Sequence, residues 1–251
     1  MSKEPLVSVI ITYYKKKLFL KKTLNSIFNQ TYKNYEIIFV FDDKDKNDLK
    51  FVKHNLLKFK KKKLIVNNKN LGVAKSRNIA LKNSNGSYVA FIDADDLWKK
   101  KKLSMQIKFM KKNSCDFSFT SYSIIDEKNS FVMSRKVSTD ADYKSLVKSN
   151  YIGLNTVVVN KKLVRHLYFP HLRTQEDFAV WLKLCRKGIK LRHLKENLSY
   201  WRKTKNSLSS NTLLKLFDAF KLFYFYEKKN FIFSIYSVLV LSYNKVLKNY
   251  L

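Results

Sequence analysis

Short apolar runs alternate with amphipathic stretches along the first half of the chain. Four runs are apolar on both faces, which is typical of strands inside a covered sheet, and they span residues 6–12, 36–41, 63–66 and 88–92. Between them, segments 18–29 and 72–83 carry apolar residues at helical spacing. This alternation predicts an α/β fold with a Rossmann-like, mostly parallel sheet flanked by helices.

The pattern loosens after Asp96. We expect a helix near 98–111, and then strands near 116–123 and 131–137 joined by a polar connection over 126–129. A further helix is expected over 176–186, closed by Gly188, because glycine is favoured just past a helix end. A strand near 190–193 follows it.

The chain changes character from Leu213 onward, where it becomes aromatic and basic. We therefore divide it into a domain over 1–210 and a C-terminal helical extension over 211–251. The uncharged run 231–244 is shorter than the roughly 20 residues that cross a bilayer, which disfavours a full span. One interpretation is a pair of helices packed on the domain, which we favour. The other is an interfacial anchor whose flanking lysines meet anionic headgroups, namely Lys228, Lys229, Lys245 and Lys248.

Composition limits the class of protein. A chain of 251 residues holds one large domain or two small ones, and 45% hydrophobic with 15% aromatic residues excludes a disordered tail and a disulfide-stapled miniprotein. The net charge of +32 favours anionic partners such as nucleic acid, phosphorylated small molecules or acidic lipids. An excess of lysine spread over solvated surfaces explains the charge equally well.

Cysteine usage and the N-terminus bear on the compartment. Cys115 and Cys185 follow no metal or redox spacing, which is typical of a reduced cytosolic chain. The apolar run 6–12 is too short for the core of a signal peptide, so we do not expect translocation.

The segment YVAFIDADDLW is the most informative part of the sequence for chemistry. Its strand ends in Asp93, Asp95 and Asp96, and ligands of open α/β sheets bind beyond the carboxyl ends of strands. Clustered carboxylates repel one another unless a divalent cation lies among them and bridges to phosphates. Capping of the following helix is the alternative, and it accounts for one or two of these acids but not the third.

Two further segments adjoin this edge of the predicted sheet. Asp42 and Asp43 directly follow the strand EIIFVF, and Asp43 could accept a hydrogen bond from a base or a sugar hydroxyl, although a turn role is favoured when the residue is taken alone. In NNKNLGVAKSRNIAL, Gly72 precedes a helix that carries Lys75 and Arg77 in its first turns. Cations at a helix start make an anion site, and the fork of donors on Arg77 suits a diphosphate.

Taken together, these segments resemble the inverting glycosyltransferases of family 2, which have the GT-A fold. The resemblance runs from about Leu6 to Trp201, and its motifs occur in the family's order and spacing: VSVIITYY, SIFNQTYKNYEIIFVFDD, NKNLGVAKSRNIAL, GSYVAFIDADDLW and QEDFAVWLKL. It implies transfer of a sugar from a nucleotide-diphosphate sugar to an acceptor hydroxyl with inversion, dependent on Mg²⁺ or Mn²⁺.

The resemblance also implies roles for the donor site. Tyr14 and Asp43 would hold the nucleotide base, with Thr12 beside them. Asp93 and Asp95 would be the acids of the DxD motif, which contact ribose and metal.

The remaining implied roles concern the metal, the phosphates and the acceptor. Asp96 would be the next acid at the metal, after Asp95, and Arg77 would lie near the donor phosphates. In QEDFAVWLKL, Asp177 resembles the family's general base, which removes the proton of the acceptor hydroxyl. Capping of the helix ahead of Phe178 is the alternative for Asp177.

The sequence departs from the family pattern at several places. Lys44 and Asp45 follow Asp43 where Gly-Ser is usual, and Lys15 replaces a common Asn. The stretch LSYWRKTKNSLS lacks the family's His but supplies Arg202, Lys203 and Lys205. Either these cations hold the diphosphate instead, or this part of the site is altered.

We expect an enzyme of cell-envelope or surface polysaccharide synthesis with a glycan or lipid-linked acceptor. Its expected location is the cytoplasm, with an anionic membrane surface as a candidate partner on the inner face. One rival is a basic module without catalysis that binds nucleic acid or membrane, although such a module has no need of acids beside its anion site. The other rival is a nucleotidyl transferase of the same fold.

Overall fold

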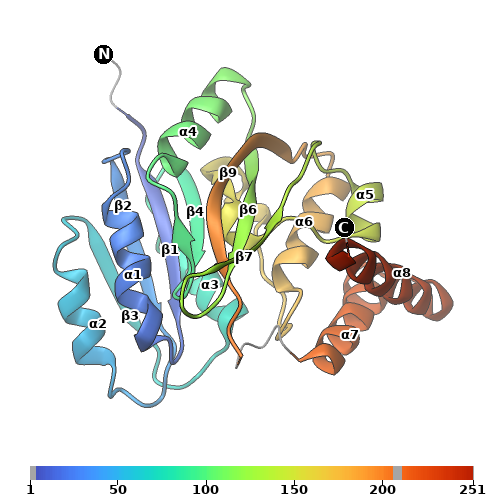
Figure 1. The fold of residues 1–251 in the computed structure, drawn as a ribbon, viewed down its shortest axis with the longest axis horizontal. Coiled ribbons are helices and arrows are strands. Elements are labelled where there is room, and N and C mark those ends of the chain that lie inside the picture. The colour runs from blue at the N-terminus through green and yellow to red at the C-terminus, as the bar shows by residue number, and fades with distance from the viewer. Residues whose placement is uncertain (1–3, 206–210, 251) are drawn as a thin grey trace.

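The computed structural model describes residues 4–205 and 211–250, with 245–250 described by their backbone alone (Figure 1). The boundary predicted at 210/211 and the side chains of Lys245 and Lys248 lie outside the described residues. The strands are β1 (Val7–Tyr13), β2 (Tyr35–Phe41), β3 (Lys62–Val66), β4 (Tyr88–Asp93), β5 (Leu97–Trp98), β6 (Phe117–Ile125), β7 (Phe131–Arg135), β8 (Val158–Asn160) and β9 (Arg192–Arg202). The helices are α1 (Lys17–Phe28), α2 (Leu49–Leu56), α3 (Val73–Lys82), α4 (Lys102–Lys112), α5 (Tyr143–Lys148), α6 (Glu176–Arg186), α7 (Thr212–Lys221) and α8 (Phe231–Tyr250), with short helical turns η1 (Leu154–Thr156), η2 (Lys161–His166) and η4 (Leu222–Tyr226).

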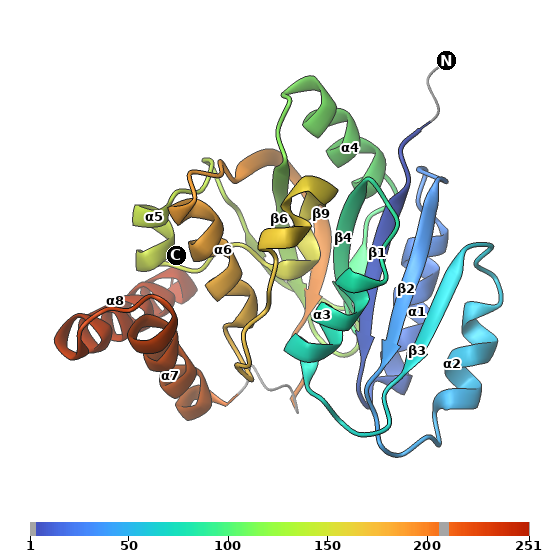
Figure 2. The same cartoon turned by 180° about the vertical axis from the view of Figure 1, so that it is seen from behind.

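One sheet runs through the molecule in the order β3-β2-β1-β4-β8-β6-β9-β5, and β7 pairs with β6 (Figures 1 and 2). The four strands predicted from the apolar runs form its parallel half, where β1 lies between β2 and β4 and β2 pairs with β3. In the other half, β8 is antiparallel to β4 and β6, whereas β6 and β9 are parallel. The α/β fold is confirmed, and the sheet as a whole is mixed.

Helices cover both faces of the sheet. Alternate residues of β1 point to opposite faces: Val9 and Ile11 belong to the apolar cluster that includes α1, α2 and α4, whereas Ile10 belongs to the cluster that includes α3 and α6. This two-sided burial explains why the central strands are apolar at nearly every position.

The segment after the three aspartates differs from the prediction. Residues Leu97–Trp98 form the strand β5, which pairs with β9, and α4 begins only at Lys102. The indole N–H of Trp98 donates to the backbone carbonyl of Asn155 at 2.8 Å. The acids therefore stand before a strand, and the interpretation of them as caps of a helix was wrong.

Other elements depend on tertiary pairing. The strand expected near 190–193 runs over Arg192–Arg202, because β6 continues to pair with it through shifts of register. The helix expected over 176–186 is confirmed as α6, and Gly188 follows it with φ of 74°. The sequence pattern did not indicate α2, α5 or β8.

The C-terminal helices α7 and α8 lie together at the end of the molecule opposite α2 and β3 (Figures 1 and 2). The partly buried Val238 and Leu241 of α8, and the buried Leu222 and Phe223 of η4 between the two helices, join the apolar cluster that includes α6. In the part of the chain that the structure describes, no helix has both the length and the apolar character needed to cross a membrane.

Candidate active site

The carboxyl ends of the parallel strands bring the predicted acids to one edge of the sheet. In the sheet register, Thr12 of β1 lies between Val40 of β2 and Asp93 at the end of β4. Asp42 and Asp43 follow β2 directly, so their backbone reaches the same edge. This is the edge where ligands of α/β proteins bind.

An open pocket of about 380 Å³ lies at this edge, lined by Tyr14, Lys15, Asp43, Lys44, Asp45 and Asn70. The structure therefore brings together Tyr14 and Asp43, which the sequence assigned to the nucleotide base. The half-buried Thr12 lies near the end of β1, two residues before Tyr14 in the sequence. Asp43 also accepts a hydrogen bond from the backbone N–H of Asp45 at 3.2 Å, so it holds its own turn as well. Its role toward a nucleotide stays a prediction.

Asp42 has a different function from its neighbour. Its carboxylate accepts hydrogen bonds from the backbone N–H groups of Leu71 and Gly72, at 2.8 and 2.9 Å, and from the side chain of Asn67 at 2.7 Å. Gly72 has φ of 84°, a conformation that glycine adopts without steric cost, and α3 begins at the next residue. Asp42 therefore fixes the start of α3, the helix that carries Arg77.

Arg77 joins two acids from distant parts of the chain. Its guanidinium is 4% exposed and contacts Asp93 Oδ1 with Nη2 at 2.7 Å and Glu176 Oε1 with Nη1. The end of β4 is thereby tied to the first turn of α6. The sequence placed Arg77 near the donor phosphates, and this role stays a prediction; the contacts in the structure make it a residue that positions two carboxylates.

Asp177 lies beside this cluster in the first turn of α6, partly exposed to solvent. Burial of the carboxyl group, reinforced by the charge of Glu176, raises its pKa to about 7, although Arg77 and a hydrogen bond from the backbone N–H of Phe178 oppose the rise. Gln175 occupies the N-cap position of α6, so Asp177 lies inside the helix and not at its cap. A carboxylate with a pKa near neutrality is well suited to take a proton.

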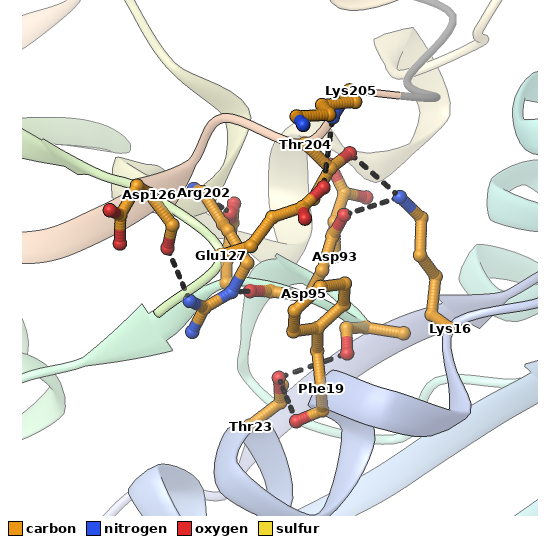
Figure 3. A network of polar contacts seen from close by, with 12 residues as sticks. Lys16, Phe19, Thr23, Asp93, Asp95, Asp126, Glu127, Arg202, Thr204 and Lys205 are labelled. Atoms are coloured by element: carbon orange, nitrogen blue, oxygen red, sulfur yellow. Dashed lines mark hydrogen bonds and ion pairs between the residues drawn. The ribbon is translucent and has the colours of Figure 1, made fainter. Parts of the chain in front are cut away.

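Asp95 lies in the polar network of Figure 3. Its Oδ2 atom is 2.7 Å from Nζ of Lys16, which also donates to Oγ1 of Thr204 at 3.3 Å. The backbone carbonyl of Asp95 accepts a hydrogen bond from Nε of Arg202 at 2.7 Å. Burial raises the pKa of Asp95, and Lys16 opposes that rise.

Arg202 binds groups of the protein itself. Beyond the carbonyl of Asp95, its guanidinium donates to the backbone carbonyl of Asp126 at 2.7 Å and to Oδ1 of Asn129 at 2.8 Å, and it lies 4.8 Å from the ring centroid of Phe19. The side chain therefore joins the DxD segment to the loop between β6 and β7 (Figure 3). Its expected contact with the donor diphosphate stays a prediction.

Asp96 is built into the interior and is 1% exposed. Its Oδ1 accepts the backbone N–H of Arg202 at 2.8 Å, and its Oδ2 accepts the side-chain amide of Asn155 at 2.7 Å. Burial raises its pKa well above the ordinary range, and the charges of Asp95 and Asp93 add to the rise. Both oxygens serve the fold, so we leave Asp96 out of the metal ligands that we propose below.

Three residues that contact the predicted acids or Arg77 had no role assigned from the sequence, namely Lys16, Asn155 and Glu176. Lys16 belongs to a run of lysines, and nothing in that run distinguishes it from its neighbours. Glu176 directly precedes Asp177, but only the fold shows that it faces Arg77. Within the described ranges, no group of three or more His, Cys, Asp or Glu side chains is arranged to hold a metal ion.

Comparison with known proteins shows which family the chain resembles. The family described as "Glycosyl transferase family 2" matches residues 8–168. WfaP of Escherichia coli, named as a UDP-Glc:alpha-D-GlcNAc-diphosphoundecaprenol beta-1,3-glucosyltransferase, is 37% identical over 84% of this chain and 82% of its own length. TuaG of Bacillus subtilis, whose name assigns it to teichuronic acid biosynthesis, is 35% identical over 83% of each chain.

Among solved structures, S. aureus TarS 1–349 in complex with UDP-GlcNAc superposes with a TM-score of 0.70 at 21% identity. The alignment covers 86% of this chain and 66% of TarS 1–349. At that identity the likeness shows a shared fold. The sequence matches and the acids gathered at the carboxyl edge of the sheet lead to one conclusion: this chain is a glycosyltransferase and belongs to glycosyl transferase family 2.

Proposed function

We propose that this glycosyltransferase moves a sugar from a nucleotide-diphosphate sugar to an acceptor hydroxyl, with inversion at the anomeric carbon and with the help of a divalent cation. The observation that carries the proposal is the pair of contacts made by Arg77. They hold Asp93, at the end of β4, and Glu176, next to Asp177, on one guanidinium. A donor-side acid and a candidate base thus share one site.

The reaction that fits this site is a single displacement. The acceptor oxygen forms a bond to the anomeric carbon, while the bond from that carbon to the phosphate oxygen breaks and its electron pair leaves with the nucleoside diphosphate. Asp177 takes the hydroxyl proton during attack, which its pKa of about 7 permits at neutral pH. One displacement from the face opposite the leaving group inverts the configuration.

The donor set is compatible with Mg²⁺ or Mn²⁺, because both ions prefer carboxylate and phosphate oxygens. Asp93 and Asp95 would hold the ion together with the donor phosphates. In the structure each acid is paired with a protein cation, Asp93 with Arg77 and Asp95 with Lys16, so the ion would share these carboxylates with the two cations. Bound there, the ion would neutralise the charge that develops on the leaving diphosphate.

The names of the relatives support a role in the cell envelope. TuaG is named for teichuronic acid biosynthesis and WfaP for transfer to a diphosphoundecaprenol-linked sugar. We infer a glycan or lipid-linked acceptor for this chain in cell-envelope or surface polysaccharide synthesis. We place the enzyme in the cytoplasm, peripheral on the inner face of the membrane.

Thermal stabilisation by ligands tests the donor class. A panel of nucleotide sugars, each with and without Mn²⁺, should raise the melting temperature for the correct donor, because a ligand that binds only the native state stabilises it. Asp95→Asn should weaken that shift, whereas Asp177→Asn should keep it and lose transfer. Asp140→Asn is the matched control, since Asp140 pairs with Arg192 in a separate ion pair.

The products distinguish the rival functions. Release of a nucleoside diphosphate supports sugar transfer, whereas release of pyrophosphate would show nucleotidyl transfer. Full transfer activity in Asp177→Asn or Asp95→Asn would refute the assignment. Tight nucleic-acid binding that weakens steeply with salt, together with no response to any nucleotide sugar, would favour the basic binding module.

A further inference from the structure

The C-terminal helices carry their large apolar side chains on the outside. On α8, five exposed residues recur at helical spacing and so share one face of the helix: Ile232, Ile235, Tyr236, Leu239 and Tyr243. Ile232 is 80% and Leu239 62% exposed. The opposite face of α8, which packs on the domain, includes the fully buried Ser234 and Ser237. The outer face of α8 is therefore apolar, and its inner side also packs apolar residues, Val238 and Leu241, on the domain.

The neighbouring helix continues this face. On α7 and η4, the exposed apolar residues are Leu213, Leu216, Phe217, Tyr224, Phe225 and Tyr226. Phe231 at the start of α8 contacts Phe220 of α7 edge to face, with ring centroids 5.6 Å apart, which joins the two helices. We call the exposed apolar residues of α7, η4 and α8 the C-terminal apolar face. Large exposed apolar residues gathered on adjacent helices of a protein mark a site of interaction.

Among the described charged side chains of segment 211–251, those at the surface have one sign. Asp218 and Glu227 are the acidic residues of segment 211–251, and both are buried. Asp218 accepts from the backbone N–H and hydroxyl of Thr174 at 2.8 and 2.9 Å, and Glu227 accepts from the hydroxyl of Tyr143 at 2.8 Å. Cations lie at the surface instead, including the exposed Lys228 and the half-buried Lys221, whose Nζ is 4.3 Å from the ring centroid of Phe217.

We propose that the C-terminal apolar face binds the surface of an anionic lipid bilayer. Its apolar and aromatic side chains would enter the boundary between headgroups and acyl chains, and its lysines would meet the anionic headgroups. A second copy of the chain suits this face less well. Two such faces brought together would oppose their lysines, and both acids of the segment are already engaged inside each copy.

This surface also lies close to the site. Asp218 of α7 binds Thr174, three positions before Asp177 in the sequence. A bilayer under α7 and α8 would therefore adjoin the loop that leads into the candidate base. This inference specifies which surface would hold the enzyme at the membrane, and its biological role rests on the proposed function. Lipid binding itself can be measured without any substrate.

Flotation of the full chain with vesicles tests the proposal. The protein should float with phosphatidylcholine vesicles that contain phosphatidylglycerol, and more weakly with phosphatidylcholine alone. The double variant Ile232→Ser/Leu239→Ser should lose roughly tenfold or more in vesicle affinity, because each side chain would no longer be buried in lipid. Lys221→Gln/Lys228→Gln should lose roughly tenfold on anionic vesicles only, since each lysine near such a surface contributes measurably.

Matched controls lie at the other end of the molecule. Leu57→Ser removes an exposed leucine beside α2, and Lys50→Gln/Lys53→Gln removes exposed charges on α2 itself. Neither should alter flotation. Equal binding of all variants, or no flotation of the unchanged protein on anionic vesicles, would overturn the proposal. So would a stable dimer in light scattering that Ile232→Ser/Leu239→Ser converts to monomer, because a second copy would then be the occupant. Sugar transfer to a soluble acceptor, measured in parallel, shows separately whether the proposed reaction holds.

Discussion

Replacing Asp177 by asparagine should separate stability from activity. The carboxyl group lies in the first turn of α6, where burial and the charge of Glu176 raise its pKa from the ordinary 3.8 to about 7. Such a group is harder to ionise in the folded protein than in the unfolded chain. The fold therefore carries an energetic cost at the position where we propose the base, and asparagine, which is neutral and of equal size, should remove that cost.

The sign and size of the effect follow from the pKa. Below about pH 4 the group is protonated in both states and costs nothing. The cost grows as pH rises from 4 to 7 and is complete above 7, because only the folded state holds the proton in that interval. A rise from 3.8 to about 7 corresponds to at most about 4 kcal/mol. Because Asp177 is partly exposed, we expect about 1 to 3 kcal/mol in practice.

Urea unfolding at pH 5 and pH 8 measures this. Asp177→Asn should gain more stability over the unchanged protein at pH 8 than at pH 5, while sugar transfer is lost at both. In the unchanged enzyme, kcat/KM should rise with pH up to about 7 and then level off, because the base must be ionised.

Asp142→Ala provides a control of opposite sign. Asp142 caps α5 by accepting the backbone N–H of Ser145 at 2.7 Å, and its pKa is lowered by that hydrogen bond. Loss of this cap should lower the free energy of unfolding by about 1 kcal/mol at pH 8. If Asp177→Asn were destabilised at pH 8, or gained equally at both pH values, the reasoning about a buried, costly carboxylate would be refuted.

Two further substitutions probe buried charges. Lys102 is fully buried, donates to Gln106 at 2.7 Å, and has a pKa well below its ordinary value because of burial. Between this lowered pKa and the ordinary value of 10.5, the unfolded chain binds a proton that the folded protein does not. The free energy of unfolding should therefore increase as pH rises towards 10.5, by up to about 1.4 kcal/mol per pH unit. Lys102→Met should flatten that slope in urea unfolding, and an unchanged slope would contradict the prediction. Arg77→Lys should lower the free energy of unfolding by roughly 3 kcal/mol and reduce kcat at least tenfold, because an ammonium group cannot bridge Asp93 and Glu176 as the guanidinium does. Near-normal stability and kcat in Arg77→Lys would show that the bridge does not position the site.

The parallel half of the sheet and the acids at its edge could be predicted from the amino-acid sequence alone. Continuous apolar runs can be satisfied only by strands covered on both faces, and the carboxyl ends of parallel strands share one edge, so Asp43 and Asp93 had to approach each other. The order and spacing of the motifs between about Leu6 and Trp201 were enough to indicate the family that the comparisons confirm. These features are encoded by short segments of sequence or by the periodicity of apolar residues along the chain.

The contacts of each charged group depend on the three-dimensional fold. Arg77 was predicted from its helix start to face phosphates, yet its nitrogens meet Asp93 and Glu176, which lies far along the chain. The segment Leu97–Trp98 became a strand because β9 pairs with it, and no local pattern encodes that partner. Likewise, the apolar periodicity of α8 fits a buried face as well as an exposed one, and only the packing of Val238 and Leu241 on the domain shows that Ile232 and Leu239 face outward. Periodicity fixes which residues share a face, whereas the direction of that face depends on contacts between distant segments.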